Sequence, residues 1–301
     1  MKKGVLFIIL IFLCFSCKSS YTKIGDTNAN YIPYYLKVYE ADSLYIVGSH
    51  KHSFDILDSL FAKYEPINMQ MYYEVINYMK LKVILNKQTS KKELKSWIVK
   101  YGVSLSNLEN DSLLSYYSIK NSKWLVKNYP KLRKKFMTSI NLDLREEINK
   151  MISQDQYYRN NNYQANIDRQ NRIDSINAKR YVEIFDEYGY PNDRVIGDYS
   201  IDKRIINPST ILLHTKNKER IDYFLPKVLE FIKKGQAPPK VYALMYDQYY
   251  LYNGSDQYFG SYSNSTDTPV NELNERREKI GLPNYFYDEW RYKKLYPDDD
   301  Y

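Results

Sequence analysis

Apolar residues recur at intervals of three and four positions through most of this 301-residue chain, which is the spacing of one face of an α-helix. In the second half, this spacing predicts helices over residues 139–158, 163–188, 209–215, 219–234, 241–250 and 271–280. In the first half, it predicts shorter helices over residues 53–64, 71–83, 91–101 and 106–117. The pattern therefore indicates a mainly α fold, with a multi-helix C-terminal domain preceded by a smaller, mostly helical N-terminal region.

Capping signals support these helices. Ser90 and Glu93 have the spacing of a capping box, and Ser106 and Glu109 repeat it. Gly189 is placed to end the long helix before it. Pro226 either splits the run over residues 219–234 or lies in the first turn of its second part.

One stretch departs from helical spacing. Residues 35–39 and 44–48 are short runs rich in aromatic and β-branched side chains. Such runs are typical of strands, so they favour a short hairpin within the N-terminal region.

The first residues have the composition of an export signal. Lys2 and Lys3 precede an uncharged apolar run over residues 5–15, which is too short to span a bilayer. Ser16 and Cys17 follow this run directly. A small residue and a cysteine after an apolar run resemble a bacterial lipoprotein signal, which implies cleavage after residue 16 and a lipid on Cys17.

The lipoprotein signal usually has leucine three residues before that cysteine, and this chain has Cys14. An ordinary secretory signal is the alternative. The polar residues 17–30 show no periodicity and predict a flexible tether between the lipid and the folded chain. We therefore expect a protein of the cell envelope, held to a membrane by its N-terminal lipid.

The charge distribution suggests where the chain divides. Residues 18–144 contain 19 Lys and Arg against 11 Asp and Glu, whereas residues 145–301 contain 23 against 25. We expect a helical N-terminal region over residues 31–140, a helical C-terminal domain over 141–292 and an acidic tail over 293–301. A basic half beside a lipid suits an anionic membrane or envelope polymer, but a lysine-rich solvated surface is the simpler explanation. No nucleic-acid motif is present.

Short motifs follow one another in order over residues 154–287. They are Asp155-Gln156-x-x-Arg159, Asp174-x-x-Asn177, Glu187-Tyr188-Gly189-Tyr190-Pro191, Gly197, His214, Asp247, Gln257-Tyr258-Phe259-Gly260 and Arg276-Arg277-x-x-x-Gly281-Leu282. This series resembles an uncharacterised bacterial family, a domain of unknown function. The chain departs from the family pattern at Tyr190, where tryptophan is usual, and at Gln248, where arginine is usual; the spacing of residues 257–260 also differs by one. The resemblance covers under half of the chain and implies a site without naming a reaction.

Four polar residues interrupt otherwise apolar helices and are the candidates for chemistry. His214 follows three aliphatic residues, and Asp247 lies in an apolar run, so Asp247 or Asp155 could orient His214 as a general base. Arg159 lies one helical turn after Asp155 and could contact an anion. The alternatives are a satisfied core histidine and an ordinary ion pair.

The loop released at the Asn253-Gly254 turn is expected to close over these residues. The predicted ligand-binding residues are Gln156, Arg159, Gln257, Tyr258, Gly260 and Arg277. We expect one connected polar cluster, open to solvent on one side. No metal-ligand spacing is present and no cofactor is predicted. The sequence favours a binding or interaction module for an anionic envelope ligand or protein partner; the alternative is a metal-independent hydrolase or transferase.

Overall fold

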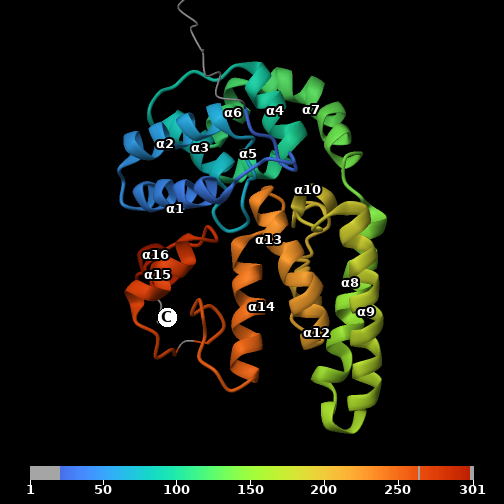
Figure 1. Cartoon of the computed structure of the whole chain (residues 1–301). Helices are drawn as coiled ribbons and strands as arrows, with labels where there is room; N and C mark the ends of the chain where they lie inside the picture. Colours follow the sequence, from blue (N-terminus) through green and yellow to red (C-terminus); the bar gives the residue numbers. More distant parts are fainter. Residues whose placement is uncertain (1–20, 264, 299–301) are drawn as a thin grey trace, which may run out of the picture.

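The computed structural model describes residues 21–263 and 265–298, and within them the chain is mainly helical, as its spacing predicts (Figure 1). The N-terminal half contains α1 (Ile32–Ile46), α2 (His50–Lys63), α3 (Glu74–Ile84), α4 (Lys91–Tyr101), α5 (Leu105–Asn110), α6 (Ser115–Lys120) and α7 (Ser122–Met137). The C-terminal half contains α8 (Leu142–Asn160), the 3-10 turn η1 (Tyr163–Asn166), α9 (Ile167–Tyr188), α10 (Asp193–Ile196), α11 (Ser209–Leu212), α12 (Asn217–Glu219), the π turn η2 (Arg220–Phe224), α13 (Leu225–Lys233), α14 (Pro239–Tyr252), α15 (Val270–Glu278) and α16 (Tyr287–Leu295). No helix in the described ranges is both long and apolar enough to cross a bilayer.

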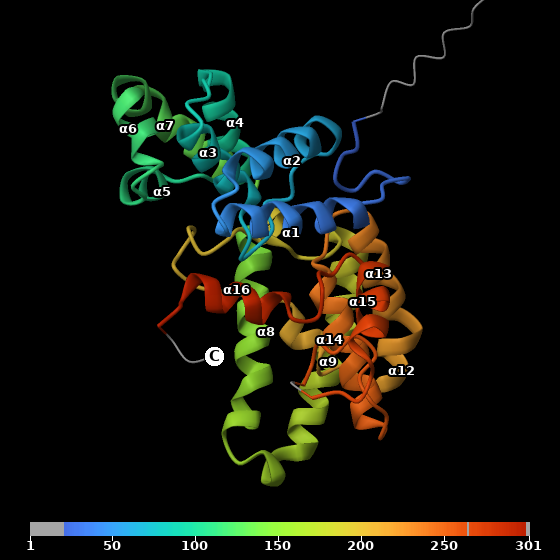
Figure 2. The ribbon, with the colours of Figure 1, turned by 90° about the vertical axis from the view of Figure 1, so that its left-hand side faces the viewer.

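The helices form two groups. Helices α1–α7 pack together at one end, while α8 and α9 form a long antiparallel pair that points away from them (Figures 1 and 2). Helices α13 and α14 stand beside that pair, and the chain then returns through α15 to place α16 against α1. The last helix therefore packs against the first.

The predicted hairpin over residues 35–48 is wrong, because α1 runs through it. Tyr34, Tyr35, Val38 and Tyr39 are buried at helical spacing. These aromatic and β-branched side chains pack on one face of a helix, and tertiary packing overrides their strand preference.

Several helix ends match their predicted signals. Ser90 and Glu93 form the capping box of α4, and Gly189 ends α9 with a positive φ of 73°. The second capping box lies two residues earlier than predicted and joins Ser104 to Asn107. Pro226 lies in the first turn of α13, one of the two alternatives.

The predicted flexible tether is ordered from Tyr21 onward. The amide of Thr22 donates to the carbonyl of Lys63 at 2.9 Å, and the amide of Gly25 donates to Lys234 at 2.9 Å. These backbone bonds hold the segment to the ends of α2 and α13. The part of the predicted tether before Tyr21, together with Cys17 and the predicted signal, lies outside the described residues. At the other end, α16 extends to Leu295, three residues into the predicted acidic tail.

Buried contacts cross the predicted division at residue 140. The hydroxyl of Tyr35 donates to the carbonyl of Ala237 at 2.9 Å, although the two residues lie far apart in the sequence. The hydroxyl of Tyr287 donates to Asp42 at 2.7 Å, and Arg291 contacts the same carboxylate at 2.8 Å. One buried apolar cluster includes residues from Tyr31 to Met245. The two halves therefore share much of one core.

Candidate functional site

The residues predicted from the sequence fall into two groups. The first, the His214 cluster, consists of Asp155 and Arg159 on α8, Asp174 on α9, and His214 just after α11. The Nδ1 atom of His214 lies 2.8 Å from Asp155, and Arg159 contacts Asp155 at 3.0 Å and Asp174 at 2.8 Å. Asp155 and Arg159 meet because they lie one helical turn apart.

The His214 cluster has a buried base and a partly open rim. Asp155 is fully buried, whereas the side chains of His214 and Arg159 are 23% and 19% exposed. Nδ1 faces Asp155, and Nε2 makes no hydrogen bond to any described residue. An imidazole held by a carboxylate on one side and free on the other has the arrangement of a general base.

Buried polar groups extend this cluster along α8 and α9. Gln156 donates to Asp155 at 2.7 Å, and Gln170 donates to Asp174 at 2.8 Å. The side-chain oxygen of Gln170 and the side-chain nitrogen of Asn177 are buried without a hydrogen-bond partner among the described residues. A buried polar atom without a hydrogen bond lowers the stability of the fold. Packing alone therefore does not explain why these polar side chains lie between α8 and α9.

The second group centres on Asp247, which organises a loop. Its Oδ1 accepts from the amides of Tyr258 and Phe259, both at 2.8 Å, and its Oδ2 accepts from the amide and hydroxyl of Ser261, both at 2.7 Å. Asp247 is fully buried. No hydrogen bond among the described residues joins it to His214, so Asp155 is the carboxylate that orients the histidine.

Most of the predicted ligand-binding residues hold the same loop. Gln257 is buried and bonds to the backbone of Ser263 through both its oxygen and its nitrogen. Arg277 is buried and donates to the carbonyls of Phe259 and Pro283. Their polar atoms are occupied within the protein, which leaves little for a ligand.

Gly260 and Tyr258 complete that loop. Gly260 has a positive φ of 61°, and a Cβ there would lie 2.6 Å from the ring of Tyr285. Tyr258 is 36% exposed, and the guanidinium of Arg276 lies 4.1 Å from the centre of its ring. Glycine is thus required by close packing, and Tyr258 alone of this group faces solvent.

A third place, which the sequence did not indicate, contains a pocket of about 250 Å³. It lies between the segment before α3 and the segment that includes α10, and we call it the acidic pocket. Its wall is formed by Gln70, Tyr73, Arg145, Asp193, Gly197, Asp198, Tyr199, Ile205 and Ile206.

The arginine of the acidic pocket is fully engaged. Arg145 is buried and donates to both oxygens of Asp202, at 3.0 and 2.6 Å, and to the carbonyls of Ile196, Gly197 and Arg204. A guanidinium has five N–H groups, and these contacts use all of them. Arg145 therefore holds the loop over residues 196–204 in place and has no N–H group left for a ligand. The carboxylates of Asp193 and Asp198 are the remaining charged groups in the wall of the pocket.

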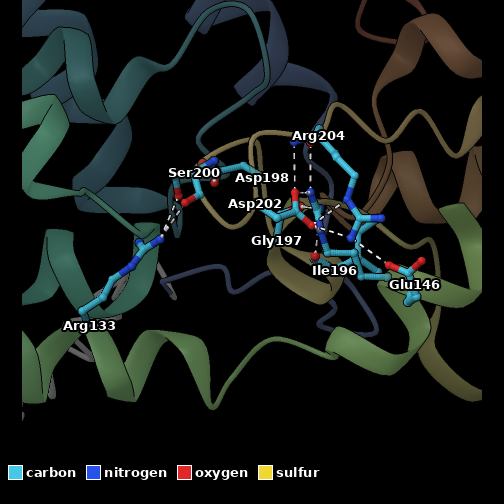
Figure 3. A network of polar contacts seen from close by, with 9 residues as sticks. Arg133, Glu146, Ile196, Gly197, Asp198, Ser200, Asp202 and Arg204 are labelled. Carbon is cyan, nitrogen blue, oxygen red and sulfur yellow. Dashed lines mark hydrogen bonds and ion pairs between the residues drawn. The ribbon is translucent and has the colours of Figure 1, made fainter.

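The loop that carries the acidic pocket is held at both ends. Figure 3 shows Arg133 reaching Ser200 from α7, while Arg204 contacts Glu146 of α8 on the other side. Asp198 accepts from the amide of Ser200 at 2.9 Å, which turns the chain between these two points.

Burial and like charge change the ionisation of the pocket groups. Burial, reinforced by the nearby Asp198 carboxylate, raises the pKa of Asp193 to about 7, against the opposing effect of Arg145. Burial first, and then Asp193 and Asp198, raise the pKa of the Tyr73 phenol. Asp193 therefore exchanges its proton near neutral pH, whereas an ordinary aspartate is fully ionised there.

The segment that contributes Gln70 and Tyr73 to the acidic pocket has unusual backbone geometry. Asn68, Met71 and Tyr73 have positive φ values of 62°, 74° and 43°. Residues with side chains rarely adopt this conformation, and clusters of such residues occur at functional sites. No three His, Cys, Asp or Glu residues in the described ranges are grouped so that they could hold a metal ion.

The signals for this pocket in the sequence were weak. Gly197 belonged to the motif series, but Asp193 and Asp198 lie in a segment without periodicity, and Tyr73 lies some 120 residues earlier. The fold and its sites define a mainly helical protein with a His–Asp cluster and a small acidic pocket. No protein-family model matches the chain, and no match was found among curated proteins or solved structures. The family resemblance of residues 154–287 stays a prediction.

Proposed function

We propose that this protein is a lipid-anchored binding protein of the cell envelope whose acidic pocket holds an ammonium group of its ligand. The observation that carries this proposal is the set of free polar groups in the pocket. They are two carboxylates, two phenols and the side-chain amide of Gln70, so the free charged groups are both acidic because the one arginine is fully engaged.

The chemistry of these groups favours a cation. An ammonium carries three N–H donors and no acceptor, which complements carboxylates. Tyrosine rings add favourable cation–π contact, and the ammonium of Lys203 already lies 5.1 Å from the centre of the Tyr199 ring. The pocket volume of about 250 Å³ suits a small amine or one amino-bearing residue of a larger chain. The expected anionic ligand does not suit this pocket.

The test compares three small probes: cadaverine as a diamine, maltotriose as a neutral polyol and succinate as a dianion. We expect cadaverine alone to bind at pH 8 in a calorimetric titration. The Asp198→Asn variant should bind it at least tenfold more weakly, because asparagine keeps the acceptor for Ser200 but removes the charge.

The matched control is Asp168→Asn, which removes one exposed carboxylate on α9 that makes no ion pair with a described residue. This control should bind cadaverine as the unmodified chain does. Preferred binding of succinate, or equal loss in both variants, would contradict the proposal.

The cellular location is tested separately. We expect Cys17→Ser to release the protein from the membrane fraction, whereas Cys14→Ser should not, because only Cys17 follows the apolar run and a small residue. Retention of Cys17→Ser in washed membranes would remove the lipid from the proposal.

A second candidate function is a metal-independent hydrolase or transferase. It is favoured by the 2.8 Å contact between His214 Nδ1 and Asp155 and by the partly exposed ring. Its test is a screen of the purified chain with chromogenic esters, phosphates and glycosides. Any activity should disappear in His214→Asn and persist in His52→Asn.

A further inference from the structure

The chain contains a long segment with charges of one sign. Residues 112–142 include seven Lys or Arg and no Asp or Glu. The segment includes α6 and α7. On α7, Lys123, Lys127, Lys131 and Lys134 follow at intervals of four, four and three, which places them on one face of the helix.

These lysines are free at the surface. All four are exposed, as are Lys120 and Lys135, and none forms an ion pair with a described residue. Arg133 differs, because it points inward to the carbonyl of Gly102 and to Ser200. The opposite side of α7 is buried through Leu125, Leu132 and Phe136. Packing therefore fixes which face of α7 the lysines occupy.

Two large apolar side chains accompany the lysines. Val126, on α7 beside Lys123 and Lys127, is 81% exposed, and Ile119, at the end of α6, is 76% exposed. A helix face that combines lysines with exposed aliphatic side chains is typical of helices that lie on a membrane surface. We call the face formed by Ile119, Lys123, Val126, Lys127 and Lys131 the basic face.

We propose that the basic face lies against an anionic membrane surface. Anionic lipid headgroups complement the unpaired lysines, and the lipid boundary takes up Val126 and Ile119. A soluble anionic polymer would match the charges but would gain nothing from the two aliphatic side chains, so the membrane is the better fit.

The N-terminal segment would bring a membrane to the part of the molecule that contains α1–α7. This step rests on the proposed lipid on Cys17. Tyr21, where the described structure begins, follows Cys17 by four positions, which span at most about 14 Å when the chain is extended. Residues 21–31 bond to the ends of α2 and α13, and they lie away from the tip of the α8–α9 pair (Figures 1 and 2). A lipid so close would hold this part of the molecule at the bilayer.

The test uses the chain from residue 18 onward, which keeps every described residue and lacks the lipidated cysteine. Its binding is measured by sedimentation with vesicles of zwitterionic phosphatidylcholine and with vesicles that also contain anionic phosphatidylglycerol. We expect binding only to the anionic vesicles. Combined replacement of Lys123, Lys127 and Lys131 by serine should weaken it at least tenfold.

The matched control replaces Lys216, Lys218 and Lys279 by serine, which removes the same charge from exposed sites outside the basic face. It should bind as the unmodified chain does. Val126→Ser should reduce the part of the binding that persists at high salt, and all variants should keep a cooperative melting transition.

Three results would overturn the proposal: equal weakening by the two triple replacements, equal binding to both kinds of vesicle, or binding to dextran sulfate without binding to vesicles. The last result would make the basic face a site for soluble polyanions. Because the soluble chain is used, failure here leaves the lipid anchor untouched, and failure of the Cys17→Ser test leaves the basic face untouched.

Discussion

At the scale of single residues, two carboxylates illustrate how surroundings determine a role. Asp155 is buried between His214 and Arg159, so its charge has partners on two sides. Asp193 lies beside a second aspartate, and burial raises its pKa to about 7. The first is paired with His214 and Arg159, whereas the second gains a proton near neutral pH.

The raised pKa of Asp193 predicts a pH-dependent stability. Because the folded-state pKa lies above the unfolded value near 4, the folded protein loses stability as pH rises from about 4 to about 7. Asparagine cannot ionise, so Asp193→Asn should be more stable than the unmodified chain by about 2 kcal/mol more at pH 8 than at pH 5. Urea unfolding at both pH values measures this difference, and a difference independent of pH would contradict it.

The Asp155–His214 contact predicts energetic coupling. Loss of Asp155 leaves His214 without this partner, and loss of His214 removes one partner of the buried Asp155, so Asp155→Asn and His214→Ala should each destabilise the protein by about 2 kcal/mol. The double variant should be more stable than the sum of the two losses implies, by about 1 kcal/mol. Additive losses in a double-mutant cycle would show that the two side chains act independently.

The sequence could identify these polar residues but not all of their partners. Asp155, Arg159, His214 and Asp247 are noticeable because they interrupt apolar periodicity. Whether His214 meets Asp155 or Asp247 depends on how α8 and α11 pack, which residue types alone do not determine. Asp193 carried no signal, because its raised pKa comes from neighbours brought together only by folding.

At the scale of elements, the loop after α14 depends on one buried carboxylate. In Asp247→Asn, an NH2 group replaces one of the two carboxylate oxygens. This group donates hydrogen bonds, and it would face backbone amides or a hydroxyl that also donate. We expect the amides of Tyr258, Phe259 and Ser261 to exchange with solvent at least tenfold faster, with a loss of about 2 kcal/mol in stability.

Hydrogen exchange followed by mass spectrometry measures this effect. Asp256→Asn is the comparison, because Asp256 is exposed and bonds mainly to Thr266 and Thr268 of the same loop. Unchanged exchange in Asp247→Asn would show that the loop holds itself without the carboxylate.

Helices with strong periodicity were predicted, and among those that were not, α7 and α16 show the reason. Residues 122–137 carry many lysines and Pro130 near the middle, which obscure the apolar face of α7 formed by Leu125, Leu132 and Phe136. Residues 287–295 have little apolar periodicity, and α16 is held instead by polar contacts to Asp42. Local pattern is informative where a helix buries one apolar face, and fails where tertiary contacts supply the stability.

At the scale of the whole molecule, the shared core bears on how the chain divides. The boundary predicted at residue 140 falls at the turn between α7 and α8. Tyr35 and Asp42 on α1 nevertheless bond to residues after position 230. A fragment that begins at Asn141 would expose the surface that packs on α1.

We therefore expect that fragment to melt without a cooperative transition, whereas the chain from residue 21 to 301 should melt cooperatively. Calorimetry of both measures the difference. A cooperative transition in the fragment would instead show that the C-terminal domain predicted from the sequence folds alone.

The measurement that tests the proposed function most directly is a calorimetric titration of cadaverine at pH 6 and pH 8. With a pKa of about 7, Asp193 is mostly protonated at the lower pH and mostly ionised at the higher one. We predict affinity about tenfold higher at pH 8, and no such rise in Asp193→Asn. Equal affinity of the unmodified chain at both pH values, or no binding at either, would contradict a cation in the acidic pocket.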